Sequence, residues 1–183
     1  PALVDIQING YKGQEFSSPE LTSEKVASIV RDNYPFGVTS LCPTLTTQSP
    51  QVLSHGLSAI ASTCKEFPEE GRRILGIHLE GPFMSTEDGP RGAHPAEHCQ
   101  PPDWDLFQRL QEAADGRIAI LTMSVEFDES PAFIEKATES GVCVAIGHTA
   151  ADSDHIRAAV DAGAKLSTHL GNGAHRQLRR HPN

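Results

Sequence analysis

Short apolar segments rich in β-branched residues alternate with segments of helical character along this chain, and this alternation constrains its fold more than any other feature. The candidate strands are residues 2–8, 37–42, 74–79, 118–125, 142–147 and 165–169. The candidate helices are residues 20–33, 48–63, 103–114, 131–140 and 152–162. Such an order predicts a parallel sheet with crossover helices, and the nearly continuous apolar strands indicate that both sheet faces are covered.

Helix-start and helix-stop residues agree with these boundaries. Residues that favour a helix start stand at the beginning of four candidate helices, namely Thr22, Ser49, Ser130 and Asp152. Gly141 and Gly163 stand where a helix should stop before the next strand. The signals at both ends therefore support regular strand–helix units.

Two parallel folds fit this alternation. A dinucleotide-binding sheet would carry a GxGxxG turn after an early strand, but the first strand ends in QINGYKG, which lacks that turn. A (β/α)8 TIM barrel fits better, because its active site is assembled at the carboxyl ends of the strands and polar residues occur there. These polar strand-end residues are Gln7, Asn9, His78, Glu80, His148 and His169. We therefore expect an α/β protein of the TIM-barrel type.

The number of strand–helix units falls short of a whole barrel. A TIM barrel usually has eight strands in about 250 residues, whereas these 183 residues contain about six units. The chain also begins inside what looks like the first strand. We therefore expect residues 1–183 to be a partial TIM-barrel catalytic domain of a longer protein.

Charge and hydropathy exclude some classes of partner. The formal net charge of −9 disfavours a general nucleic-acid surface, which would be basic. No apolar run approaches the roughly 20 residues that a membrane-spanning helix needs, and the first residues lack a secretion signal. Cys42, Cys64, Cys99 and Cys143 lie far apart without CxxC spacing, which favours reduced thiols. We expect a cytoplasmic protein without nucleic-acid or membrane partners.

A basic cluster near the end of the chain departs from the acidic average. Residues 175–181, HRQLRRH, contain three arginines and two histidines. This pattern is compatible with a solvated basic loop or with a local site for an anion such as phosphate, which arginine recognises well.

Three candidate metal ligands stand at the ends of different predicted strands. Glu80, His148 and His169 supply one carboxylate and two imidazoles, a set that suits one divalent ion and leaves a position open for water. A single histidine at a strand end more often has a structural role, but three ligand types at one barrel level favour a metal site. Zn²⁺ is the expected ion, although Fe²⁺, Mn²⁺ and Co²⁺ also fit this set.

Around these residues the sequence resembles the N-acetylglucosamine-6-phosphate deacetylase family of the amidohydrolase superfamily. The resemblance is carried by VDIQING, GVTSLCPTL, GIHLEGPF, RGAHP, VAIGHT and STHLGNG. It implies metal-dependent hydrolysis of the N-acetyl amide of N-acetylglucosamine 6-phosphate, which yields glucosamine 6-phosphate and acetate. The implied metal ligands are Glu80, His148 and His169. The resemblance also implies an N-terminal small β domain and final barrel units outside these residues.

The first strand departs from the two-histidine pattern of many amidohydrolases. Gln7 and Asn9 stand where those proteins have an HxH pair, and a carboxamide is a poor metal ligand. The resemblance therefore implies a single metal ion, with Gln7 and Asn9 on the substrate side.

Further substrate contacts follow from the resemblance alone. His94 in RGAHP matches a histidine that touches the substrate, and Asn172 and Gly173 match a segment whose backbone amides meet the phosphate. Arg180 matches a phosphate-binding arginine that reaches across a dimer interface, so a homodimer is implied. The general acid/base is expected to be an aspartate at the end of strand eight, beyond Asn183.

Two departures keep other functions open. Gly171-Asn172-Gly173-Ala174 stands where the family commonly has an aromatic residue followed by Asn-Ala-Met, and the insert 84–91 differs in length from several members. Either change is compatible with another acylated amino sugar, with or without phosphate. A different amidohydrolase acting on a cyclic amide or a nucleobase is another alternative. A further alternative is a catalytically inactive relative that binds a sugar phosphate.

Overall fold

The computed structural model describes residues 2–175 and 177. The chain forms two compact units. Unit 1 consists of the residues up to Leu79 together with Asp105–Ala119, and unit 2 consists of Glu80–Trp104 and the residues from Ile120 onward. In the part of the chain that the structure describes, no helix combines the length and apolar character needed to cross a bilayer.

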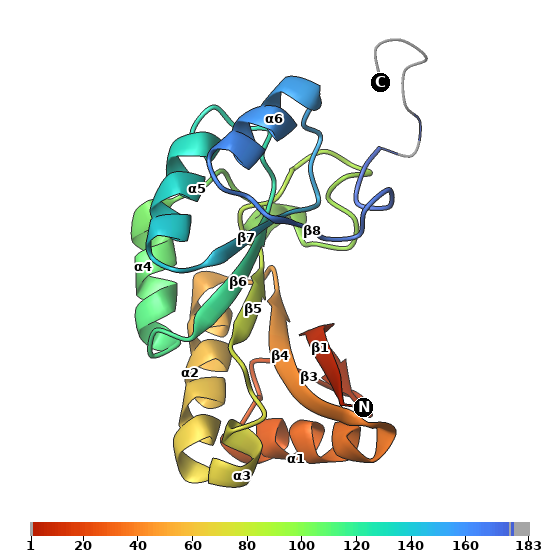
Figure 1. The fold of residues 1–183 in the computed structure, drawn as a ribbon, viewed down its shortest axis with the longest axis vertical. Coiled ribbons are helices and arrows are strands. Elements are labelled where there is room, and N and C mark those ends of the chain that lie inside the picture. Colours follow the sequence, from red (N-terminus) through yellow and green to blue (C-terminus); the bar gives the residue numbers. More distant parts are fainter. Residues whose placement is uncertain (1, 176, 178–183) are drawn as a thin grey trace. The chain divides into compact units, whose positions relative to one another are not determined.

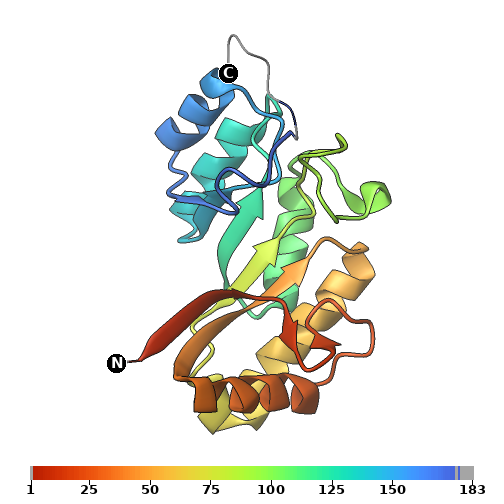
Figure 2. The same ribbon diagram turned by 90° about the vertical axis from the view of Figure 1, so that its right-hand side faces the viewer.

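Unit 1 is built around parallel strands. Strand β1 (Leu3–Ile8) pairs with β4 (Val38–Thr46) in parallel, with Leu3 opposite Val38, and Figure 2 shows the two strands alongside one another. A parallel bridge between Leu41 and Ile74 brings the segment before β5 (Ile77–Glu80) next to β4. A small antiparallel hairpin, β2 (Gly10–Tyr11) with β3 (Gln14–Glu15), follows β1.

The helices of unit 1 begin where the capping residues predict. Helix α1 (Ser23–Asn33) starts after Thr22, whose side chain accepts a hydrogen bond from the backbone N–H of Lys25. Helix α2 (Pro50–Glu66) starts after Ser49 in the same way. The remaining helices are η1 (Tyr34–Phe36), α3 (Pro68–Gly71) and α4 (Trp104–Ala113), whose first residue lies in unit 2.

Unit 2 continues the same alternation. Strands β6 (Ile118–Met123), β7 (Cys143–Ile146) and β8 (Leu166–Ser167) pair in parallel, and the first two residues of β6 lie in unit 1. Helices α5 (Ser130–Glu139) and α6 (Ser153–Asp161) lie side by side near β7 (Figure 1). The short helix η2 (Ala96–His98) lies in the long connection after β5.

The parallel α/β architecture is confirmed. The strands are hydrogen-bonded in the order β1-β4-β5-β6-β7-β8, and each of the six predicted strands corresponds to one of them. The sequence did not predict the β2–β3 hairpin, because strands of two residues are too short to show a period of two. In the structure, the turn residues Lys12 and Gly13 both have positive φ angles, 51° and 76°, as a tight hairpin turn requires.

Candidate metal centre

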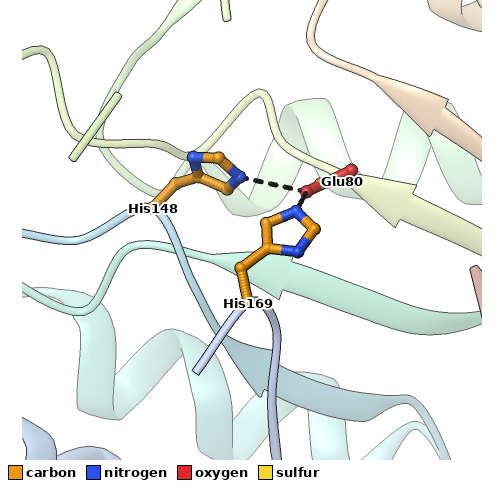
Figure 3. Close-up of side chains that lie close together, drawn as sticks. All are labelled: Glu80, His148 and His169. Atoms are coloured by element: carbon orange, nitrogen blue, oxygen red, sulfur yellow. Dashed lines mark hydrogen bonds and ion pairs between the residues drawn. The ribbon is translucent and has the colours of Figure 1, made fainter. Parts of the chain in front are cut away.

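One oxygen of a buried carboxylate lies within reach of two imidazoles. Oε1 of Glu80 is 3.1 Å from Nε2 of His148 and 3.1 Å from Nε2 of His169 (Figure 3). One ligand atom from each of the three residues lies within 4.8 Å of the others. The predicted convergence of these side chains is therefore present.

Parallel strand ends explain this convergence. Glu80 is the last residue of β5, His148 follows β7 after Gly147, and His169 follows β8 after Thr168. Because the carboxyl ends of parallel strands meet at the same edge of a sheet, residues far apart in sequence can share one site. All three residues belong to unit 2.

Both histidines have an unusual backbone conformation. The φ angles of His148 and His169 are 51° and 52°, in the left-handed region that side chains other than glycine rarely adopt. Each such residue costs on the order of 1–3 kcal/mol and persists only when its surroundings hold it. The carbonyl of His169 accepts hydrogen bonds from the N–H groups of Asn172 at 2.7 Å and Gly173 at 3.1 Å. The carbonyl of His148 accepts one from Ser85 at 3.1 Å.

The ring of His148 is oriented as a metal ligand should be. Its Nδ1 lies 3.0 Å from the carbonyl oxygen of Pro90. Since a carbonyl can only accept, Nδ1 carries a proton and donates it. Nε2 faces Glu80, to which it donates a hydrogen bond when protonated; loss of that proton would free its lone pair for a metal ion. Histidines that bind metals almost always donate their second ring N–H in this manner. The residues present therefore fit a divalent ion.

Burial and charge set the protonation of the centre. Burial alone would raise the pKa of Glu80, but the hydrogen bond from His148 and the positive fields of the neighbouring histidines outweigh it and hold the pKa at about 2. For His148, burial opposes the charged form, yet the hydrogen bond and charge of Glu80 raise the pKa above its ordinary value. Glu80 is consequently a carboxylate at neutral pH, as a metal ligand must be.

His94 lies beside the three ligand residues. It is buried, its Nε2 is 3.9 Å from Oε1 of Glu80, and its ring packs edge-on against that of His148 with centroids 4.3 Å apart. Burial, followed by the field of His148, lowers the pKa of His94 to about 4, so the ring is neutral at pH 7. Arg91 donates a hydrogen bond to the carbonyl of His94 at 2.8 Å. The substrate contact of His94 stays a prediction.

Asn172 and Gly173 also lie close to the metal ligands. A Cβ atom on Gly173 would stand 3.2 Å from the backbone nitrogen of His148, a tight contact that would require a shift of a few tenths of an ångström. The N–H groups of Asn172 and Gly173 already donate to the carbonyl of His169, and a phosphate would have to compete with that carbonyl for them.

The other predicted substrate contacts belong to unit 1 or fall outside the described residues. Gln7 belongs to β1 and Asn9 follows it, both in unit 1, and their part in the site stays a prediction. Arg180 lies outside the described residues, as does most of the basic cluster 175–181.

Sequence reasoning missed one polar residue of this region, Glu126. It directly follows the predicted strand 118–125, so it carried the same strand-end signal that pointed to Glu80. Its carboxylate accepts hydrogen bonds from Ser85, Ser124 and the backbone of Ala150.

Comparisons with known proteins give deacetylases of amino-sugar phosphates among the relatives of this chain. No family model matches the chain. The N-acetylglucosamine-6-phosphate deacetylase of Bos taurus is 39% identical over 175 residues, which cover 94% of this chain and 42% of that protein. The deacetylase of the same name from Bacillus subtilis is 34% identical over 94% of this chain and 43% of its own length. An N-acetylgalactosamine-6-phosphate deacetylase from Shewanella is 31% identical over 98% of this chain and 44% of its own length.

Solved structures agree with these relatives. N-acetyl-D-glucosamine-6-phosphate deacetylase from Mycobacterium smegmatis is 35% identical and superposes with a TM-score of 0.85 over 98% of this chain and 49% of its own. A mutant of that enzyme in complex with N-acetyl-D-glucosamine-6-phosphate gives 0.86 at 35% identity, over 98% of this chain and 45% of its own. This chain thus spans less than half the length of the relatives it matches. The likeness confirms the predicted fold, an incomplete (β/α)8 barrel.

Proposed function

Because this chain belongs to the N-acetylglucosamine-6-phosphate deacetylase family, we propose that the protein containing it removes the acetyl group of N-acetylglucosamine 6-phosphate. The products are acetate and glucosamine 6-phosphate. The observation that carries the proposal is the convergence of Glu80, His148 and His169 on one point at the carboxyl ends of three strands. The relatives at 31–39% identity support the substrate class.

The three ligand residues would hold one divalent ion. Zn²⁺ is the proposed ion, because a Glu/His/His set is typical of catalytic zinc, although Fe²⁺, Mn²⁺ and Co²⁺ accept the same donors. When bound, such an ion lowers the pKa of water toward about 7 and polarises the amide carbonyl of the substrate. Glu80 contributes a negative charge that offsets part of the ion's charge, and its pKa of about 2 keeps it ionised across the neutral range.

His94 would act on the substrate as a neutral imidazole. Its pKa of about 4 means that it is uncharged at pH 7 and can accept or donate one hydrogen bond. Its Nε2 lies 3.9 Å from the carboxylate oxygen of Glu80, and His94 is not in the group formed by Glu80, His148 and His169, which supports a role beside the proposed ion. We assign it to holding the acetamido group or a neighbouring hydroxyl of the sugar.

The remaining substrate roles are extensions of the family resemblance. Gln7, Asn9, Asn172 and Gly173 are proposed substrate contacts, and Arg180 is the proposed phosphate ligand, contributed to the site of a partner subunit in a homodimer. Protonation of the leaving nitrogen requires a general acid, which we assign to an aspartate outside residues 1–183. Residues 1–183 are accordingly the first part of a catalytic barrel domain in this proposal.

A reducing compartment such as the cytoplasm is proposed for the protein. All four cysteines are free thiols, and disulfides are rare in reducing compartments.

A second substrate deserves the same test because one relative acts on a different sugar by name. The Shewanella relative is an N-acetylgalactosamine-6-phosphate deacetylase. The full-length protein, loaded with Zn²⁺, should be assayed for acetate release from N-acetylglucosamine 6-phosphate, N-acetylgalactosamine 6-phosphate and unphosphorylated N-acetylglucosamine. The proposal predicts the highest kcat/KM for the first. Equal turnover of the phosphorylated and unphosphorylated glucosamine substrates would contradict a phosphate site, and absence of acetate from all three would contradict the activity.

A further inference from the structure

Glu126 links three loops that follow three different strands. Its Oε1 accepts a hydrogen bond from the hydroxyl of Ser85, after β5, at 2.9 Å. Its Oε2 accepts one from the hydroxyl of Ser124, after β6, at 2.9 Å and one from the N–H of Ala150, after β7, at 2.7 Å. Hydrogen bonds to an ionised acceptor are roughly twice as strong as neutral ones, so this carboxylate is a strong local tie.

Two of the tied residues adjoin His148, Ser85 through a hydrogen bond and Ala150 in sequence. The N–H of Ser85 donates to the carbonyl of His148 at 3.1 Å, and Ala150 lies two residues after that histidine. Between them, the hydroxyl oxygen of Thr149 accepts hydrogen bonds from the N–H groups of Val125 at 3.2 Å and Ala151 at 3.1 Å. Glu126 therefore fastens the loop that carries His148 at two points, at the carbonyl of His148 through Ser85 and at the N–H of Ala150 directly.

His148 needs such fastening because of its backbone conformation. With a φ angle of 51° it occupies the left-handed region, which an unsupported histidine would leave. A change in its backbone would swing the ring and move Nε2 away from Glu80, from which it is now 3.1 Å distant.

We propose that Glu126 is a positioning residue for the metal centre: its carboxylate fixes the three loops so that His148 presents Nε2 to the ion. The inference rests on the proposed metal site formed by Glu80, His148 and His169. Glu126 touches neither the ion nor the substrate in this account. It acts only through the geometry of the loop that carries His148.

The hydrogen-bond pattern predicts which substitution preserves this role. The N–H of Ala150 can only donate, so a glutamine at position 126 must turn its oxygen toward Ala150 and its amide NH₂ toward Ser85. The hydroxyl of Ser85 can accept, and the hydroxyl of Ser124 still donates to the oxygen that meets Ala150, so all three contacts survive. Alanine removes them all. A role in geometry thus predicts that glutamine substitutes for glutamate and that alanine does not, whereas a role of charge predicts that both fail.

The test is a zinc titration of the metal-free full-length protein. Zn²⁺ affinity should be measured by competition with a chromophoric chelator for wild type, Glu126→Ala, Glu126→Gln and Glu129→Ala, with thermal unfolding of each metal-free variant alongside. Glu129→Ala is the matched control, because it removes another carboxylate from the same connection. The side chain of Glu129 is exposed and forms no capping hydrogen bond with α5. Because Glu126 acts one step beyond the direct partners of a ligand, whose loss costs about 10- to 100-fold, Glu126→Ala should weaken zinc binding by about tenfold, the lower end of that range.

We expect weakened zinc binding in Glu126→Ala and unchanged binding in Glu129→Ala. The zinc affinity of Glu126→Gln should lie within roughly threefold of wild type, a difference on the scale of less than one net hydrogen bond. Wild-type affinity in Glu126→Ala, or equal losses in the alanine and glutamine variants, would overturn the proposal. If Glu126→Ala does not fold, Ser85→Ala decides, with weakened zinc binding supporting the role and unchanged binding refuting it. Failure of the wild-type protein to bind zinc would instead refute the metal site itself.

Discussion

Nε2 of His148 lies 3.1 Å from Oε1 of Glu80, although 68 residues separate the two in the sequence. The other ring nitrogen of His148 lies 3.0 Å from the carbonyl of Pro90. The ring is therefore held at both nitrogens, and the loop around Pro90 contributes to the centre without supplying a ligand.

A methyl group at position 92 should disturb this ring. A Cβ on Gly92, whose φ angle is 60°, would stand 3.1 Å from Cε1 and 3.3 Å from Nδ1 of His148. Gly116 is the matched control, because its φ angle of 73° is similar and a Cβ there would meet nothing within 4 Å. Both Gly→Ala variants should lose about 1 kcal/mol of unfolding free energy from backbone strain. Only Gly92→Ala should also weaken Zn²⁺ binding, by on the order of tenfold, and equal zinc affinities in the two variants would contradict the packing described.

A buried hydroxyl pair next to the centre should contribute to stability. The hydroxyl oxygens of Thr122 and Thr168 lie 2.8 Å apart, and a Cβ on Gly147 would stand 2.8 Å from the methyl group of Thr122. Thr122→Val should lower the free energy of unfolding by about 1–3 kcal/mol, because it deprives the buried hydroxyl of Thr168 of this partner. Thr122→Ser should lose less, because it keeps the hydroxyl. Urea unfolding measures both, and a valine variant as stable as the serine variant would refute the role of the pair.

Much of the fold and of the ligand set could be predicted from the sequence, for a physical reason. Parallel strands bury both faces, so each reads as an apolar run, and a polar residue at its carboxyl end has to face the active-site edge. That logic found Glu80, His148 and His169 without any short motif. The same logic applies to Glu126, which directly follows strand 118–125 and therefore carried the same signal.

Contacts made by loop backbone could not be predicted in this way. The carbonyl of Pro90 orients His148, and Gly92 packs against its ring. Both depend on the path of the long connection after β5, which has no period that a sequence pattern could reveal. The left-handed backbone of His148 and His169 was likewise invisible, because the residue type alone favours an ordinary conformation.

An ion pair in unit 1 should make stability depend on pH. Oε1 of Glu70 accepts a hydrogen bond from Nη1 of Arg31 at 2.7 Å, and that bond lowers the pKa of the carboxyl. A carboxyl with a lowered pKa in the folded state stabilises the fold above its unfolded pKa of about 4.3, and this contribution is lost as pH falls through the folded value.

Glu70→Gln should therefore cost up to about 1 kcal/mol of unfolding free energy at pH 7, and the cost should shrink as pH falls below about 4. Urea unfolding at pH 7 and at pH 3.5 gives the comparison. A cost that is the same at both values would contradict the contribution assigned to this ion pair.

The most direct measurement of the central claim is the zinc content and affinity of the full-length protein with and without the carboxylate of Glu80. Wild type should bind one equivalent of Zn²⁺, and Glu80→Gln should bind it at least about a hundredfold more weakly, since even outer partners of a ligand cost 10- to 100-fold. Glu97→Gln, an exposed carboxylate elsewhere in unit 2, should behave as wild type. Unchanged zinc binding in Glu80→Gln would show that Glu80, His148 and His169 do not form the metal centre.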